Sequence, residues 1–191
     1  MGDLLWTSDA EYQPIVWIGK RTLTAAELAQ KPHLRAILVS AHALGHKQPE
    51  RDLILSPQYR LCLTSNIVER ITGEHQALVS AKDLLELDDI DVVETDAQIT
   101  YYQVMTPEHQ LVMAHGCLGE TLFTGPQALR MIPAESRREL HALFPNMDME
   151  TMPVRPHLRG RSLDKVIARH QKHSCDFIHQ SGSISPLARV A

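Results

Sequence analysis

Histidine and cysteine side chains are the residues of this sequence best suited to chemistry, and there are eleven histidines and three cysteines among 191 residues. His42 and His46 have the i, i+4 spacing that places two metal ligands on one face of a helix. A zinc protease also needs a glutamate next to the first histidine, whereas the residues between this pair are Ala43, Leu44 and Gly45. Since Gly45 also disfavours the helix that the geometry requires, the pair does not predict a metal site.

A second group of candidate ligands lies near the C-terminus and contains His170, His173, Cys175 and His179. Arg169 and Lys172 lie among them, and cations in the last turn of a helix interact favourably with its dipole. We interpret this group as a solvated basic helix end. The sequence therefore predicts neither a metal nor a small-molecule cofactor.

The cysteines Cys62, Cys117 and Cys175 are far apart and form no CxxC pair. An odd number of cysteines argues against a disulfide framework and favours buried or free thiols in a reducing compartment. Cys62 lies inside an apolar run and Cys117 inside a candidate strand, so we expect both to pack in the core rather than to act as nucleophiles.

Composition and charge exclude several classes of function. The net charge is −4 and the sequence pI is about 6.2, so no global field attracts nucleic acid or an anionic membrane. No apolar run approaches the roughly 18 residues that a membrane-spanning helix needs. Residues 1–10 contain Asp3 and Asp9 and no basic residue, so they do not resemble a signal peptide, and we expect a cytoplasmic protein.

The first two thirds of the chain alternate short apolar runs with polar breaks, which is typical of strands. The candidate strands are Ile15–Ile18, Ala36–Val39, Leu53–Leu55, Arg60–Leu63, Ala77–Val79, Ile99–Met105, Gln110–Ala114 and Leu118–Phe123. Thr106–His109 has the composition of a hairpin turn. Thr24 and Glu27 form a capping-box pattern that predicts a short helix ending before Pro32, and Ser80 is a candidate cap for a helix at Ala81–Leu87.

After Gly125 the pattern becomes helical. A helix is predicted at Pro133–Phe144, and a second one is capped by Ser162 and carries Leu163, Val166, Ile167 and His170 on one face. We divide the chain into a β domain at 1–125, a helical C-terminal extension at 126–180 and a flexible tail at 181–191.

Several segments resemble, in their order and spacing, the bacterial Hint domains, which are relatives of hedgehog autoprocessing domains and inteins. They are Gly2–Asp9, Gln13–Gly19, Asp52–Arg60, Leu78–Leu84, Thr100–His109 with Glu120-Thr121 following, and the tail segments Arg155–Arg161 and Ala168–His170. The resemblance implies a mainly β fold, a curved and pseudo-symmetric set of strands with short helices, followed by a helical C-terminal extension.

The chemistry of that family starts with an N-terminal Cys or Ser that attacks the preceding carbonyl, and two histidines then transfer protons. The family positions in this chain are occupied by Ser56, Tyr59 and His109, which we treat as vestigial catalytic candidates. Tyr59 stands where the family has the histidine that protonates the leaving amide, and a phenol with an ordinary pKa near 10 shuttles protons poorly at neutral pH. Met1 stands where the strand bearing the nucleophile should end.

The resemblance leaves three functions open. The first is a truncated or degenerate Hint domain without self-cleavage of its own. The second is an autoprocessing domain that performs an N-to-S acyl shift once an upstream segment or a split partner supplies the nucleophile. The third is a protein-binding module on a Hint scaffold, which would associate through an exposed strand edge. The expected partner is therefore the chain's own upstream segment or a host protein.

Overall fold

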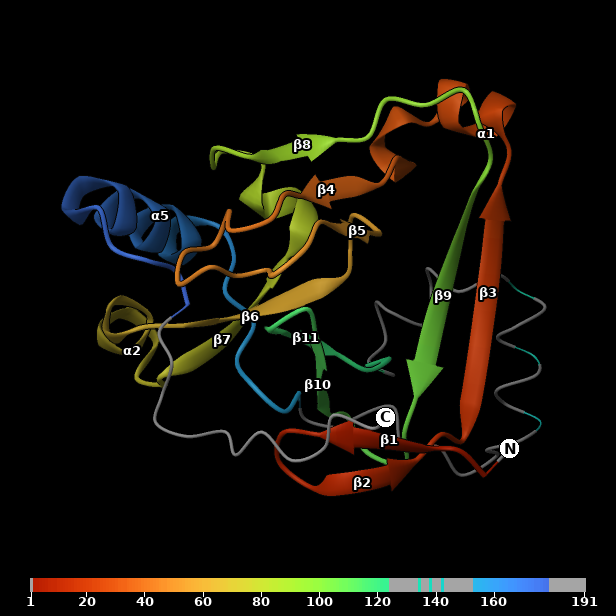
Figure 1. Cartoon of the computed structure of the whole chain (residues 1–191), viewed down its shortest axis with the longest axis horizontal. Coiled ribbons are helices and arrows are strands. Elements are labelled where there is room, and N and C mark those ends of the chain that lie inside the picture. Colours follow the sequence, from red (N-terminus) through yellow and green to blue (C-terminus); the bar gives the residue numbers. More distant parts are fainter. Residues whose placement is uncertain (1, 124–133, 135–137, 139–141, 143–152, 179–191) are drawn as a thin grey trace.

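The computed structural model describes residues 2–123, 134, 138, 142 and 153–178 (Figure 1). Their strands are β1 (Leu4–Thr7), β2 (Glu11–Pro14), β3 (Trp17–Leu23), β4 (Ile37–Val39), β5 (Leu53–Leu55), β6 (Arg60–Thr64), β7 (Gln76–Ser80), β8 (Ile90–Val92), β9 (Ile99–Met105), β10 (Leu111–Ala114) and β11 (Cys117–Glu120). The helices are α1 (Ala25–Gln30), α2 (Asn66–Thr72) and α5 (Arg161–His173), with 3-10 turns η1 (Pro32–Leu34) and η2 (Ala81–Leu84). The described fold is mainly β, as the sequence predicts.

The strands of the described residues form four small sheets. The largest has the order β10-β11-β6-β7 and is antiparallel throughout. The strands β3 and β9 run side by side as a long two-stranded ribbon, β1 pairs with β2, and β4 lies between β5 and β8 (Figure 1). Short strands divided among several sheets produce a curved β structure rather than one flat layer.

Most predicted strands are confirmed within one or two residues, but the turn at Thr106–His109 is not a hairpin turn. The strand before it, β9, pairs with β3, and the strand after it, β10, pairs with β11. The chain therefore crosses between two sheets at this point. The strand predicted at Ile15–Ile18 begins at Trp17 and continues to Leu23, and the one predicted at Leu118–Phe123 ends at Glu120.

The helix predictions have mixed outcomes. The capping box is confirmed, since the Glu27 amide donates to Thr24 Oγ1 at 3.3 Å and the Thr24 amide donates to Glu27 Oε2 at 2.9 Å. Ser80 makes no cap hydrogen bond, and only the 3-10 turn η2 follows it. Helix α5 begins at Arg161 with Gly160 at its N-cap, so Ser162 lies inside the first turn instead of capping it. The helix predicted at Pro133–Phe144 lies outside the described residues except at 134, 138 and 142, and the tail at 181–191 lies outside them entirely.

One hydrophobic core includes both the strands and the described part of the C-terminal extension. Its buried members include Leu61, Leu63 and Val79 from the sheet and Leu163, Val166 and Ile167 from the predicted apolar face of α5, together with Leu158, Phe177 and Ile178. After α5 the chain returns to the β structure, where the Phe177 amide donates to the Leu44 carbonyl and the Thr64 amide donates to the Phe177 carbonyl. Residues 153–178 are thus packed into the same core as the strands.

His170 is a structural residue of that core. Its side chain is buried, its Nδ1 lies 3.2 Å from the Cys175 carbonyl, and its Nε2 lies 2.9 Å from the Ser65 hydroxyl. The ring stacks on Phe177 with a centroid distance of 4.3 Å. The interpretation of this histidine as part of a solvated helix end is therefore wrong, although the neighbouring His173 is exposed.

The other histidine pair lies in a loop. His42 and His46 have positive φ values of 72° and 48°, so they do not share a helix face, as Gly45 led us to expect. Among the described residues, no group of three or more His, Cys, Asp or Glu side chains is arranged to hold a metal ion, and no described helix has the length and apolarity to span a membrane.

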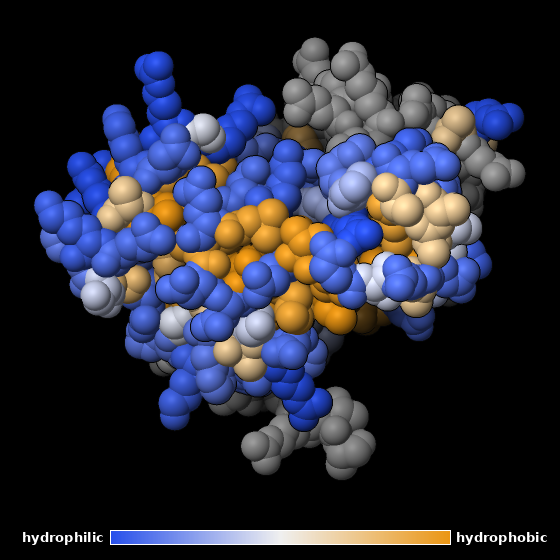
Figure 2. All heavy atoms as spheres, turned by 90° about the horizontal axis from the view of Figure 1, so that it is seen from above, coloured by the Kyte–Doolittle hydropathy of each residue, from blue (hydrophilic) through white to orange (hydrophobic). Residues whose placement is uncertain are grey.

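The uppermost sheet in Figure 1 exposes apolar side chains. Ile54 of β5 is 65 % exposed and lies opposite Leu38 of β4, and Val92 of β8 is also exposed. Figure 2, which views the molecule from above, shows an apolar patch on this side, surrounded by polar residues.

Candidate active site

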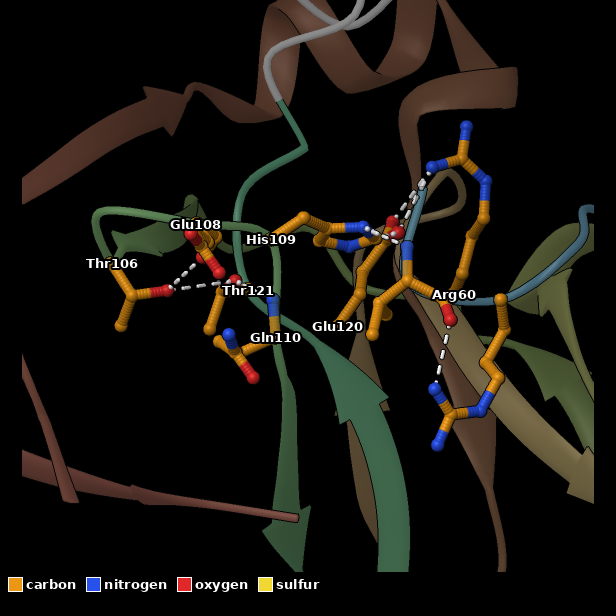
Figure 3. Close-up of polar contacts among 9 residues, drawn as sticks. Arg60, Thr106, Glu108, His109, Gln110, Glu120 and Thr121 are labelled. Carbon is orange, nitrogen blue, oxygen red and sulfur yellow. Dashed lines mark hydrogen bonds and ion pairs between the residues drawn. The ribbon is translucent and has the colours of Figure 1, made fainter. Parts of the chain in front are cut away.

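Three adjacent strands bring His109, Glu120 and Arg60 together at one end of the four-stranded sheet. Glu120 is the last residue of β11, which lies between β10 and β6. His109 precedes β10 by two residues and Arg60 begins β6. A central strand can reach both of its neighbours, so the Glu120 carboxylate meets the His109 ring on one side and the Arg60 guanidinium on the other (Figure 3).

The three side chains form a polar cluster around the Arg60–Glu120 ion pair. Arg60 Nη1 donates to Glu120 Oε1 at 2.9 Å and to Oε2 at 3.0 Å, and His109 Nε2 lies 3.2 Å from Oε2. The Glu120 side chain is 9 % exposed and the His109 side chain 3 % exposed. The Arg60–Glu120 hydrogen bonds are charge-assisted, so they are stronger than neutral ones and fix the orientation of both partners. The buried Nε2 of His109 makes no hydrogen bond to a described residue. Although it follows a turn-like segment, His109 is therefore a buried side chain.

A backbone amide fixes the tautomer of His109. The Val154 amide donates to His109 Nδ1 at 3.1 Å. Because an amide nitrogen cannot accept, Nδ1 supplies a lone pair and a neutral His109 carries its proton on Nε2, facing Glu120. Nδ1 is thus occupied in this structure, and Nε2 faces Glu120 at 3.2 Å.

A second histidine, His157, lies next to this centre. The Phe123 ring contacts His109 at a centroid distance of 5.0 Å and meets His157 edge-on at 5.5 Å. Burial, followed by the nearby positive charge of Arg60, lowers the pKa of His157 from 6.5 to about 4. Its Nε2 is buried and has no hydrogen-bond partner among the described residues. His157 is therefore neutral at physiological pH.

The Tyr59 ring packs against β11, the strand that carries Glu120. Its ring packs so closely on Gly119 that a Cβ at position 119 would come within 2.3 Å of the phenol oxygen. Burial, with a contribution from the negative charge of Glu120, raises the pKa of Tyr59 far above its ordinary value of 10. Ser56 lies in the turn before β6, where its carbonyl accepts a hydrogen bond from the Tyr59 amide.

Two threonines support the backbone on either side of His109. The Thr106 hydroxyl donates to the Glu108 carbonyl at 2.6 Å, and the Gln110 amide donates to the Thr121 hydroxyl at 2.9 Å (Figure 3). The two hydroxyls are 3.2 Å apart. These bonds hold the crossing between β9 and β10 in place and therefore position the His109 ring.

Cys62 and Cys117 are buried as expected and are poorly suited to nucleophilic attack. Burial raises the pKa of Cys62 to about 11 and that of Cys117 to about 12, so both are protonated at neutral pH. Cys175 is half-buried and follows α5. A nucleophile must be a thiolate, which these environments disfavour at Cys62 and Cys117.

Of the three predicted site residues, the structure brings His109 and Tyr59 to the same end of the sheet, through Glu120 and Gly119 of β11. The sequence analysis assigned no role to Glu120, although it lies in a segment that resembles the family. It also missed Val154 and His157, since a backbone amide leaves no sequence signal and a long segment separates both residues from His109.

The comparison with known proteins agrees with this architecture. The family model of the Hint domain matches residues 1–126, which is more than half of the chain and includes His109, Glu120 and Arg60. No curated protein and no solved structure matches the chain. On this match over β1 to β11, the chain belongs to the Hint domain family.

Proposed function

We propose that the protein is a Hint domain that does not cleave itself in this form. The observation that carries the proposal is the state of Tyr59. The family position of the general acid is occupied by a buried phenol whose pKa is raised by burial and by Glu120. Such a group holds its proton too tightly to donate to, or accept from, a reacting atom at neutral pH.

The missing step can be stated in terms of bonds. In the acyl shift, a thiolate forms a C–S bond to the preceding carbonyl, the C–N bond breaks, and the leaving nitrogen takes up a proton. Cys62 and Cys117 are protonated and buried, so neither offers the thiolate. Loss of a general acid alone costs about 10²–10⁴-fold in rate.

A second candidate is supported by the His109–Glu120 pair. A carboxylate that accepts from one nitrogen of a histidine orients the ring for proton transfer at the other nitrogen. In this structure the Glu120 carboxylate lies 3.2 Å from His109 Nε2 without forming a hydrogen bond, so the pair is close enough to form that arrangement once an upstream segment supplies the nucleophile. The proposed partner in this case is an upstream segment or a host protein.

A third candidate, a binding module, is supported by the exposed apolar side chains of Ile54 and Val92 on the two opposite edge strands of one sheet. For all three candidates we propose a reducing, cytoplasmic location, which the free cysteines Cys62, Cys117 and Cys175 support.

The test is release of a reporter fused to the N-terminus, followed by intact mass with and without dithiothreitol or hydroxylamine. We expect no release from the unmodified chain or from Tyr59→His alone. Grafting a strand that ends in Cys onto Tyr59→His should restore thiol-dependent release, and His109→Ala should abolish it again. Release by the unmodified chain that is lost in His109→Ala would show that the proposal is wrong.

A further inference from the structure

Residues 153–158, which we name the strap, cross one face of the four-stranded sheet. At one end the Val154 amide contacts His109 beside β10, and at the other end the backbone lies along β7 at the opposite edge. Between these points the Val154 side chain packs on a cluster of buried residues from all four strands, namely Cys62, Leu78, Leu111 and Leu118. The strap lies outside residues 1–126, the part of the chain that matches the Hint family model.

The strap binds the edge of the sheet as an extended peptide does. The Leu78 amide of β7 donates to the Pro156 carbonyl at 2.9 Å, and the Leu158 amide donates to the Leu78 carbonyl at 2.9 Å, so that His157 is bridged to Leu78 in parallel. Backbone pairing to an open edge, with alternate side chains in apolar contacts, is the recognition mode of β-augmentation. Any peptide with an apolar residue at the Val154 position could make the same backbone contacts.

The strap also occupies the proton-accepting nitrogen of His109. The Pro153–Val154 peptide places its N–H 3.1 Å from Nδ1, while Nε2 faces Glu120. No lone pair of the neutral ring is then left for a substrate. The Val154 amide thus blocks the nitrogen of His109 that could accept a proton. A pseudosubstrate blocks a catalytic residue in the same way.

The side chain of Arg155 holds the strap through contacts that are partly exposed to solvent. Arg155 Nη2 donates to Asp9 Oδ1 at 2.7 Å, and Arg155 Nε donates to Gln76 Oε1 at 2.7 Å. The Arg155 and Asp9 side chains are 23 % and 32 % exposed, so solvent screens their interaction and this ion pair is weak. Because the strap belongs to the same chain as the sheet, its binding is intramolecular, and a free peptide needs a high concentration to compete with it.

We propose that this face of the sheet is a binding site for an extended peptide and that the strap is its occupant in cis, which closes the site and blocks His109. The ligand class is an extended segment with an apolar residue followed by a basic one, as in Val154-Arg155. This proposal goes beyond the proposed function, because it concerns what occupies the face of the sheet. Its tests measure peptide binding and the tautomer of His109, and neither measurement depends on self-cleavage.

The first test uses Arg155→Glu, which removes the contacts of Arg155 with Asp9, Gln76 and the Val154 carbonyl and repels Asp9. The probe is a synthetic peptide of residues 153–159, titrated into ¹⁵N-labelled protein while the Leu78 amide and the His109 ring nitrogens are followed. We expect the peptide to bind Arg155→Glu at least about fivefold more tightly than the wild type, which corresponds to loss of a surface ion pair. The control is the charge swap Asp9→Arg with Arg155→Glu, which restores an ion pair on the strap and repels the arginine of the probe, so it should bind the peptide more weakly than Arg155→Glu does.

The second test measures the tautomer directly and does not depend on the peptide. Wild-type His109 should show the proton on Nε2 and an unprotonated Nδ1. Val154→Pro, which deletes the donor, should change the Nδ1 resonance, whereas Val154→Ile, which keeps it, should not. If the peptide binds wild type and Arg155→Glu equally, or binds neither while both give folded spectra, the proposal is wrong. A proton on Nδ1 in the wild type would also overturn it.

Discussion

Tyr59 and Gly119 are matched in shape: the phenol ring fills the space that any side chain at position 119 would need. An added Cβ would lie 2.3 Å from the phenol oxygen and 2.6 Å from Cε1. Since Gly119 directly precedes Glu120 on β11, this contact places a neutral, buried phenol against the strand that carries the charged centre. A side chain at position 119 is therefore incompatible with the present position of the Tyr59 ring.

Gly119→Ala should destabilise the chain, because either the Tyr59 ring or β11 must move. Overpacking of this kind costs about 1–3 kcal/mol. Urea unfolding of Gly119→Ala measures the cost. In a Tyr59→His background, where the smaller ring no longer fills the space, the same change should cost less, and an equal cost in both backgrounds would contradict the shape match.

Glu120→Gln should be costly because it leaves the Arg60 guanidinium without its carboxylate. Breaking a buried ion pair on one side typically costs about 3–5 kcal/mol, and we expect about 2–3 kcal/mol here because Arg60 is 18 % exposed. Asp9→Asn, which breaks the more exposed pair with Arg155, should cost less than about 1 kcal/mol. Chemical denaturation measures the loss of stability in each variant. Similar losses would show that the Arg60–Glu120 pair stabilises the fold no more than the Arg155–Asp9 pair does.

The three thiols should differ in reactivity. With pKa values raised to about 11 and about 12 by burial, Cys62 and Cys117 are thiolate to only about one part in a thousand or less at pH 8. Cys175 is partly exposed and should react first. Iodoacetamide labelling followed by peptide mass mapping should find one fast site per native chain and three after denaturation. Fast labelling of Cys62 in the native chain would contradict its burial.

The low pKa of His157 predicts loss of stability in acid. Its folded pKa is about 4 and its ordinary value is 6.5, so the unfolded chain binds more protons between these values and stability falls as the pH is lowered from 6.5 to 4. With partial solvent screening, we expect this residue to account for about 1–2 kcal/mol of the loss. The substitution His157→Gln removes this titrating group and leaves in place the groups whose charges act on it, which are Arg60, Glu120, His109 and Arg159.

The measurement is urea unfolding at pH 7 and at pH 4.5 for the wild type and His157→Gln. The variant should lose less stability than the wild type over this interval, whatever its stability at pH 7. An identical loss in both proteins would mean that His157 does not sense this pH range.

The strands and the apolar face of α5 could be predicted from the sequence because β-branched alternation and i, i+3, i+4 spacing are local signals. The strands β1 and β2 were missed because the polar residues between Leu4 and Pro14 hide their alternation, although the pairs Leu4↔Pro14 and Trp6↔Tyr12 are in register. Helix α2 was also missed; it begins after Ser65, which caps it by accepting from the Val68 amide.

The site could be predicted only in part. His109 was found through its family segment, but its environment was misjudged because turn composition does not reveal that β9 and β10 belong to different sheets. Glu120 becomes its partner only through the register of β10 and β11, in which Leu111 lies opposite Glu120. Val154 contacts His109 through its backbone N–H, which every residue except proline has, so the sequence contains no signal for this contact.

The shared core has a consequence for how this chain is divided. The segment that defines the family ends at residue 126, whereas Leu158, Val166 and Phe177 fill the centre of the same core. The unit that is recognised across proteins and the unit that folds are therefore different in extent. A fragment cut at the family boundary would carry a hole where these side chains belong, and grafting the Hint segment alone into another protein would transfer its pattern without its stability.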